Sequence, residues 1–252
     1  MFKYSLAATA AIVAMVPASA QAQSWTGPYI GAHIGYASGS SEADGSLSGN
    51  WTTEPAALQT EVANYIDADL DPNGVMYGLQ AGYDYQTPGN FVVGIEGDFS
   101  ILDADDDRDS PLTATAAFPS LSYAASNEID VKSMFSLRAK AGFAFGNSLL
   151  FADAGWAWVK SRYSAALSSN GGYNKAGSES DTTDGFIVGL GFEQRFGTNI
   201  SVRLDYHYTD QGDVDFTNAY LPGSTFTSPV YTETYEQDLK LHLVRLGVNF
   251  RF

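Results

Sequence analysis

Apolar residues alternate with polar or small residues along most of this chain, and that period of two limits the folds open to it. Ile95 and Phe99, for example, alternate with Glu96 and Asp98. Successive side chains of a β-strand point to opposite faces, so the pattern predicts strands with one apolar and one polar face. Eight segments share it: 29–36, 77–85, 93–101, 135–143, 150–158, 186–195, 200–208 and 244–252. The sequence therefore predicts an all-β protein with eight strands.

The connections between these strands are short and long in turn. Tight turns are predicted at 87–90, 146–148 and 197–199, and long connections at about 40–73, 103–127, 164–181 and 210–237. An even number of strands of about 10 residues, with short turns at one end and long loops at the other, is typical of a transmembrane β-barrel. We therefore expect an eight-stranded antiparallel up-and-down transmembrane β-barrel with short periplasmic turns and long acidic extracellular loops.

The first residues indicate export from the cytoplasm. Lys3 precedes an apolar stretch of eleven residues, and two overlapping sites for signal peptidase follow at 18–22. The stretch is too short to span a bilayer, which needs about 20 residues. We expect residues 1–22 to be a signal peptide, cleaved at one of these two sites, and residues 23–252 to form a single outer-membrane barrel domain.

The alternation by itself leaves open which face of the barrel is outside. A soluble barrel would turn its apolar face inward, so that alternative has to be weighed. Glycine is frequent on the polar face, which suits a crowded lumen better than a water-exposed sheet. Tyrosine and tryptophan gather near strand ends, as in the aromatic girdles of membrane barrels: Tyr36, Tyr77, Tyr85, Trp158, Tyr206 and Tyr208. Both features favour a polar lumen and an apolar surface in lipid.

Charge is divided unevenly between the predicted loops and strands. The chain carries 29 acidic and 13 basic residues, a formal net charge of −16. The four long connections hold 19 acids and 2 bases, whereas the rest of the mature chain holds 10 of each. Since an unpaired charge in a dry lumen costs several kcal/mol, we expect the inward-facing charges to form a paired structural network. Its predicted members are Glu96, Asp98, Arg138, Lys140, Asp153, Glu193, Arg195, Arg203, Asp205 and Arg245.

Both ends of the chain resemble one protein family. Residues 25–36, Trp-Thr-Gly-Pro-Tyr-Ile-Gly-Ala-His-Ile-Gly-Tyr, and the last strand, 244–252, resemble the first and last strands of the opacity-like surface antigens, the small porin-family outer-membrane proteins of Gram-negative bacteria. The resemblance implies an outer-membrane location, among lipid and lipopolysaccharide. It also implies that the barrel-assembly machinery recognises the last strand through Val248, Phe250 and Phe252. The first, second and fourth predicted loops are longer and more acidic than is usual in the family, so no loop function is carried over.

The sequence offers little for catalysis or for a bound cofactor. His207 follows the inward-facing Asp205, but no histidine stands in the His-x-Ser arrangement of the outer-membrane deacylases. Alternating carboxylates at 67–74 and 103–108 resemble the start of a calcium loop, yet the glycine and glutamate that an EF-hand requires further along are missing. We expect no enzyme activity, no metal site and no cofactor. Nucleic acid is excluded as a partner, because neutralising its phosphates requires clustered lysine and arginine side chains.

These features predict a structural outer-membrane barrel whose acidic extracellular loops contact an unknown partner. A narrow passive pore for ions or small solutes stays open as an alternative, although side chains fill the interior of most eight-stranded barrels. A haem-binding or host-binding surface receptor is a further alternative. An exposed aromatic cluster in the last predicted loop would favour a binding surface: Tyr220, Phe226, Tyr231 and Tyr235.

Overall fold

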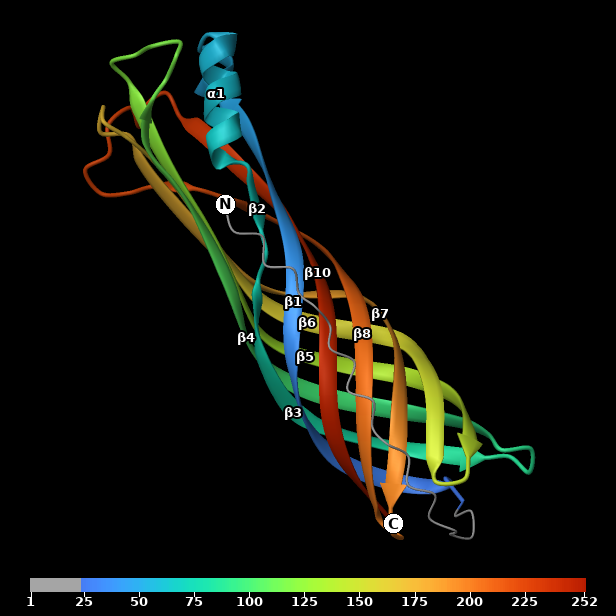
Figure 1. Cartoon of the computed structure of the whole chain (residues 1–252). Coiled ribbons are helices and arrows are strands. Elements are labelled where there is room, and N and C mark those ends of the chain that lie inside the picture. Colours follow the sequence, from blue (N-terminus) through green and yellow to red (C-terminus); the bar gives the residue numbers. More distant parts are fainter. Residues whose placement is uncertain (1–23) are drawn as a thin grey trace.

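The computed structural model describes residues 24–252, so the predicted signal peptide lies outside the described residues. Eight long strands form an antiparallel ring in the order β1, β3, β4, β5, β6, β7, β8, β10, and β10 closes the ring by pairing with β1. Figure 1 shows an elongated barrel with the C-terminus at one end and helix α1 at the other. The predicted eight-stranded up-and-down barrel is confirmed.

The elements differ greatly in length. The strands of the ring are β1 (Gly27–Gly49), β3 (Asn73–Gln86), β4 (Phe91–Ala114), β5 (Ser122–Phe145), β6 (Ser148–Ser169), β7 (Asn174–Phe196), β8 (Ile200–Thr217) and β10 (Tyr231–Arg251). Two short strands, β2 (Ala68–Leu70) and β9 (Ala219–Tyr220), pair with β1 and β7. A 3-10 helix, η1 (Asn50–Thr53), and the helix α1 (Ala56–Ile66) lie between β1 and β2. Within residues 24–252, no helix has the length and hydropathy needed to cross a membrane.

Tight turns join the strands at the end of the barrel opposite α1, which we call the turn end. They occupy residues 87–90, 146–147 and 197–199, where the sequence predicts them. Gly146 and Gly197 have φ angles of 63° and 76°. Glycine adopts this left-handed conformation without a steric penalty, which is why it occurs at these sharp reversals.

Most residues predicted to form long loops extend the strands instead. β4 and β5 continue so far that only residues 115–121 join them, and residues 170–173 join β6 to β7. Residues 218–230, which include β9, join β8 to β10. The predicted loop boundaries therefore differ from the structure, in which the strands run on well past their predicted ends.

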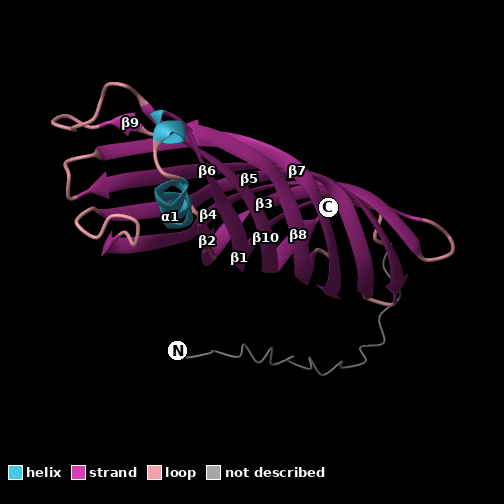
Figure 2. Cartoon of the chain, turned by 90° about the horizontal axis from the view of Figure 1, so that it is seen from above, coloured by secondary structure: helices cyan, strands magenta, loops and turns pink. Residues whose placement is uncertain are grey.

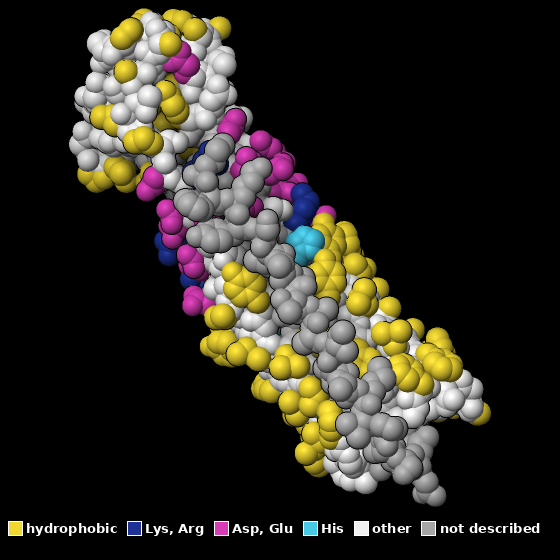
Figure 3. All heavy atoms as spheres, in the orientation of Figure 1, with side chains coloured by type: hydrophobic (Ala, Val, Ile, Leu, Met, Phe, Trp, Pro, Cys, Tyr) yellow, Lys and Arg dark blue, Asp and Glu magenta, His cyan; other side chains and the backbone are white. Residues whose placement is uncertain are grey.

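The strands run on because their two faces exchange chemistry part-way along the barrel. On β4, Ile95 is exposed and Glu96 is buried, whereas nearer to α1 it is Asp103 that is exposed and Leu102 that is buried. The apolar face thus points outward in one half of the barrel and inward in the other, as it does in water-soluble barrels. Figure 3 shows hydrophobic side chains gathered over the turn half and acidic ones above them. Each half is built for different surroundings.

The half of the barrel nearest α1 contains an apolar core. Buried aliphatic and aromatic side chains from the strands meet there, and α1 adds Leu58, Val62 and Ile66 from one face of the helix. At Gly45 of β1, a Cβ atom would lie 2.3 Å from Cγ1 of Ile66, so glycine is needed for the helix to come this close. Figure 2 shows α1 beside the strand ends at this end of the barrel.

Candidate functional site

Inside the turn half, acidic and basic side chains are buried in equal numbers. Among the described residues they are Asp84, Glu96, Asp98, Asp153, Glu193 and Asp205, with Arg138, Lys140, Arg195, Arg203, Arg245 and Arg251. Every strand of the ring except β1 contributes at least one of them. Buried charges are tolerated only when they are paired, and here the two signs balance.

Two arginines share carboxylates at the centre of this group. Arg138 lies 2.5 Å from Oε1 of Glu96 through Nη2, and it also pairs with Asp98. Arg203 lies 2.5 Å from the other oxygen of Glu96 through Nη1, and its Nε is 2.6 Å from Oδ2 of Asp205. Glu96 therefore joins two guanidinium groups from strands on different sides of the ring.

Arg245 and His207 extend the central group to the neighbouring carboxylates. Arg245 lies 2.7 Å from Asp205 and 3.3 Å from Asp98. The ring nitrogens of His207 lie 3.1 Å from Asp153 and 3.2 Å from Asp205. Since a carboxylate faces each nitrogen of His207, neither nitrogen is directed at a hydroxyl group that it could activate as a nucleophile.

A second cluster of charges lies nearer the turns. Oδ2 of Asp84 accepts from Lys140 at 3.0 Å and from Arg251 at 2.8 Å, and Arg251 is also 3.0 Å from Glu193. Lys140 donates to the hydroxyl of Tyr29 at 3.0 Å, and that hydroxyl donates in turn to a carboxylate of the central group. The two clusters thus form one continuous network of hydrogen bonds across the lumen.

Nine of the ten charged residues predicted to line the lumen lie in these salt bridges. Arg195 is the exception and corrects the prediction: its guanidinium stacks 4.5 Å from the ring of Trp25 and donates to the carbonyl of Ser24 at 2.8 Å. It forms no salt bridge within the described residues. The prediction omitted Asp84 and Arg251, although both occupy inward positions that the alternation itself identifies.

The three histidines lie apart from one another. His33 is inside the barrel, 2.9 Å from the hydroxyl of Ser100, whereas His242 is on the outer surface, 2.7 Å from the hydroxyl of Tyr206. The aspartates at 103–108 belong to the extended strand β4 and not to a loop. Among residues 24–252, no three side chains of the metal-binding kinds are grouped to hold an ion.

Another buried ion pair lies in the half of the barrel that carries α1. Lys175 of β7 is 2.6 Å from Glu233 of β10, and its ammonium group is 4.7 Å from the ring centre of Tyr220. Trp51 of η1 donates to the same carboxylate at 2.7 Å, and Tyr173 donates to it as well. This pair joins three chain segments that are far apart in sequence, and nothing in the alternation predicts it.

Comparison with known proteins agrees with this architecture. The chain matches the family described as outer membrane protein beta-barrel domain over residues 7–252. It belongs to that family. Membership places the protein in the bacterial outer membrane, with the apolar outer surface of the turn half in lipid.

Relatives and solved structures are consistent with that assignment. The 31 kDa outer-membrane immunogenic protein of Brucella melitensis biotype 1 is 26% identical over 235 residues, covering 91% of this chain and 84% of the relative. The 25 kDa outer-membrane immunogenic protein of Brucella abortus biovar 1 is 24% identical over 231 residues, covering 91% and 80%. The outer membrane protease OmpT from Escherichia coli has a TM-score of 0.50 at 8% identity, covering 89% of this chain and 97% of that one. At such low identity the likeness to OmpT concerns the fold alone.

The lipid-facing surface, which we call the membrane belt, is bounded on both sides. On β4 it runs from Phe91 to Ile101, roughly 25 Å of tilted strand, which matches the apolar band of outer-membrane barrels. On β6 it ends at the exposed Trp158, and the next outward residue is the charged Lys160. Family members have short turns on the periplasmic side, so the turn end is periplasmic and α1 is extracellular.

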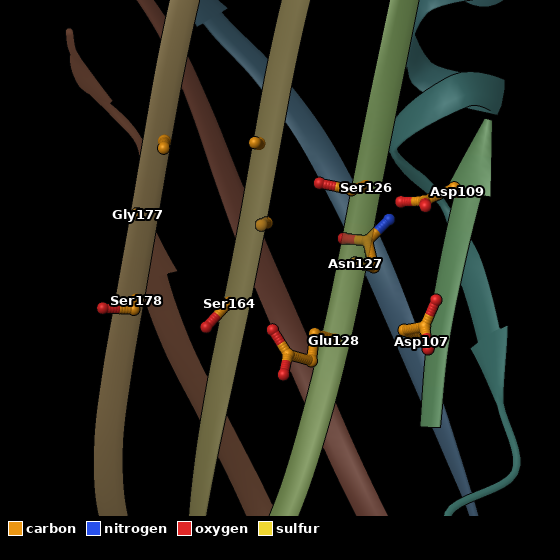
Figure 4. Close-up of a pocket in the computed structure, with 11 residues that line it drawn as sticks. Asp107, Asp109, Ser126, Asn127, Glu128, Ser164, Gly177 and Ser178 are labelled. Atoms are coloured by element: carbon orange, nitrogen blue, oxygen red, sulfur yellow. The ribbon is translucent and has the colours of Figure 1, made fainter. Parts of the chain in front are cut away.

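Above the membrane belt lies an acidic collar of exposed carboxylates. It consists of Glu42, Asp44, Asp67, Asp69, Asp71, Asp103, Asp105, Asp107, Asp109, Glu128, Glu179, Asp181, Asp184, Asp213, Asp215 and Glu236. A groove of about 650 Å³ lies on its outer face. Figure 4 shows Asp107, Asp109 and Glu128 at this groove, beside small residues of β6 and β7. Its acidic wall repels anions, and we assign it no ligand.

The stability of the extracellular half is expected to fall at alkaline pH. Burial raises the pKa of Tyr123 and of Tyr163 to about 12, against about 10 in an unfolded chain. The folded state therefore keeps protons that the unfolded state releases, so this stability is complete below pH of about 10 and is lost as pH rises toward 12. The guanidinium midpoint in detergent micelles, measured against pH, should fall across this window. Tyr163→Phe should flatten the decline, and a midpoint constant across the window would contradict the expectation.

Proposed function

We propose that this outer-membrane protein is a closed barrel that presents a raised extracellular surface for contacts outside the cell. The observation that carries the proposal is the filling of the lumen in two layers. A charge-balanced network occupies the membrane level, and an apolar core covered by α1 occupies the level above it. Water-filled porins keep a polar channel open along the whole barrel. Side chains that occupy both levels of the lumen argue against such a channel here.

The extracellular half is well suited to surface presentation. Its strands continue as a sheet beyond the membrane belt, and its own apolar core stabilises it independently of lipid. Two relatives are described as immunogenic outer-membrane proteins, which supports a role in which this half is accessible from outside. The acidic collar and the surface above it would make the contacts.

Planar bilayer recordings test the closed lumen directly. The intact protein is expected to give no discrete conductance steps, because buried side chains occupy the lumen at both levels. A variant carrying Glu96→Ala, Arg138→Ala and deletion of residues 50–66 should conduct, since both layers of the filling are then opened. Steps of uniform size from the intact protein would assign it to the alternative function, a narrow pore.

Two partners are proposed with this function. The outward-facing bases Lys132, Lys160 and Arg162 stand just above the membrane belt on β5 and β6, where phosphate groups of lipopolysaccharide would lie, and they supply the charge that such phosphates require. An exposed apolar row at the C-terminal end of the chain is formed by Val248 and Phe250 of β10 and by Phe252, which follows it. This row supports recognition by the barrel-assembly machinery.

A further inference from the structure

The extracellular tip of the barrel differs in charge from everything below it. We call this tip the crown and define it as residues 45–66, 110–127, 163–174 and 216–232. Three of these four segments contain no Asp, Glu, Lys or Arg. The first contains only Glu54 and Glu61, and both are engaged: Glu54 accepts from Tyr231 at 2.6 Å, and Glu61 accepts from backbone N–H groups of residues 116 and 117. A crown with only two charged side chains, both of them acidic, thus stands on an acidic collar.

Large apolar side chains protrude from this crown. Their exposed fractions are 57% for Leu112, 42% for Phe118, 45% for Leu221, 62% for Phe226 and 57% for Val230. Figure 3 shows separate hydrophobic patches on the tip, one acidic patch among them, and most acidic side chains below it. Exposed apolar residues grouped in one region usually mark a contact surface, whereas single ones are common everywhere.

Hydrogen bonds hold the segments of the crown together. Asn170 donates to the carbonyl of Ser120 at 2.9 Å and its own carbonyl accepts from the N–H of Ser122 at 3.0 Å, which ties two neighbouring hairpins. Thr225 donates to the carbonyl of Gly171 at 2.8 Å. The apolar side chains therefore protrude from a fixed platform, so that little ordering entropy is lost when they bind.

The crown is held far from the protein's own membrane. On β5 the membrane belt begins at Phe135, and the strand extends outward from there to Ser122. At about 3.3 Å per residue and a tilt of about 40°, this distance is roughly 30 Å. The apolar side chains of the crown are therefore out of reach of the lipid that surrounds the barrel.

We propose that the crown inserts its apolar side chains into the headgroup region of a second, opposing bilayer that carries no net charge. These side chains protrude from the end of β4 and from residues 115–121 and 218–230, and none of them lines the two grooves of about 650 and 440 Å³ on the side of the barrel. Protruding apolar side chains suit a soft lipid surface better than a protein groove. The acidic collar would repel an anionic surface, and the crown has no bases to attract one. The proposal rests on the surface-presenting role proposed above.

A single-site probe can test this because the chain contains no cysteine. Thr227→Cys places an environment-sensitive nitrobenzoxadiazole label beside Phe226, in mature protein reconstituted in nanodiscs. Addition of phosphatidylcholine vesicles should raise and blue-shift its emission. The same label at Thr182→Cys, on the exposed side of β7 below the crown, should not respond. Adding Leu112→Ser, Phe226→Ser and Val230→Ser should weaken the response at least about tenfold.

Charge and folding provide the controls. Vesicles containing phosphatidylglycerol should bind more weakly at low salt, and added salt should restore part of the binding by screening the acidic collar. The serine substitutions are on exposed side chains, so the variant should show the same shift in gel mobility on heating as the unsubstituted protein. The proposal would be overturned by any of three results. The label does not respond to phosphatidylcholine vesicles, it still responds after the three substitutions, or its signal comes from two crowns pairing between nanodiscs. If the label does not respond and the intact protein also gives no conductance, the proposed closed-barrel function is retained and only the bilayer-binding proposal is rejected.

Discussion

Arg138→Met is expected to lower the free energy of unfolding by about 3–5 kcal/mol, the usual effect of removing one partner from a buried ion pair. Arg138 is fully buried and contacts Glu96, Asp98 and, at 3.6 Å, Asp153. Methionine fills a similar volume but leaves these carboxylates without their shared cation. Guanidinium unfolding from lipid vesicles, followed by circular dichroism and by gel mobility, measures the loss.

The matched control for this substitution is Arg162→Met. Arg162 faces outward on β6 above the membrane belt and is exposed. In vesicles without lipopolysaccharide, its removal should therefore change the free energy of unfolding by no more than about 0.5 kcal/mol. Equal effects of the two substitutions would show that the lumen charges do not stabilise the barrel. They would also remove the physical basis for treating the network as a structural filling.

Glu233→Leu is expected to loosen the crown while leaving the membrane-spanning barrel intact. The substitution leaves Lys175 without a carboxylate, and it leaves the donors of Trp51 and Tyr173 without an acceptor in an apolar setting. Breaking such a pair costs about 3–5 kcal/mol. Hydrogen exchange should rise by several orders of magnitude in residues 45–66 and 216–232, and gel mobility should still change on heating.

Two variants separate charge from packing in this experiment. Glu236→Leu removes an exposed carboxylate from the same strand and should leave exchange unchanged. Adding Lys175→Met to Glu233→Leu removes both charges and should recover a large part of the protection, because an apolar replacement of a buried pair is often nearly neutral. If exchange rose equally through the membrane-spanning strands, the two halves would not be separate units of stability.

The sequence by itself determined the strand number and the tight turns, and its alternation named ten of the twelve charged residues that are buried in the turn half. Side chains alternate by geometry, so Glu96 and Ile95 must lie on opposite faces wherever the strand is placed. The same rule identifies Asp84 and Arg251 as inward-facing. The helical spacing of Leu58, Val62 and Ile66 was also present in the sequence, within a segment predicted to be a loop.

Only the tertiary structure showed that the two faces exchange surroundings part-way along the strands, and which charges meet each other. Alternation shows only that the two faces of a strand differ. Whether an apolar residue points outward, as Ile95 does, or inward, as Leu102 does, depends on whether lipid or water surrounds the barrel at that level. Above the membrane belt the polar face points outward, so the strands continue there although the sequence predicted loops. Pairing of Lys175 with Glu233, and the stacking of Arg195 on Trp25 in place of a salt bridge, depend on closure of the ring. Closure brings together strands that are distant in sequence, and no local pattern records their distances.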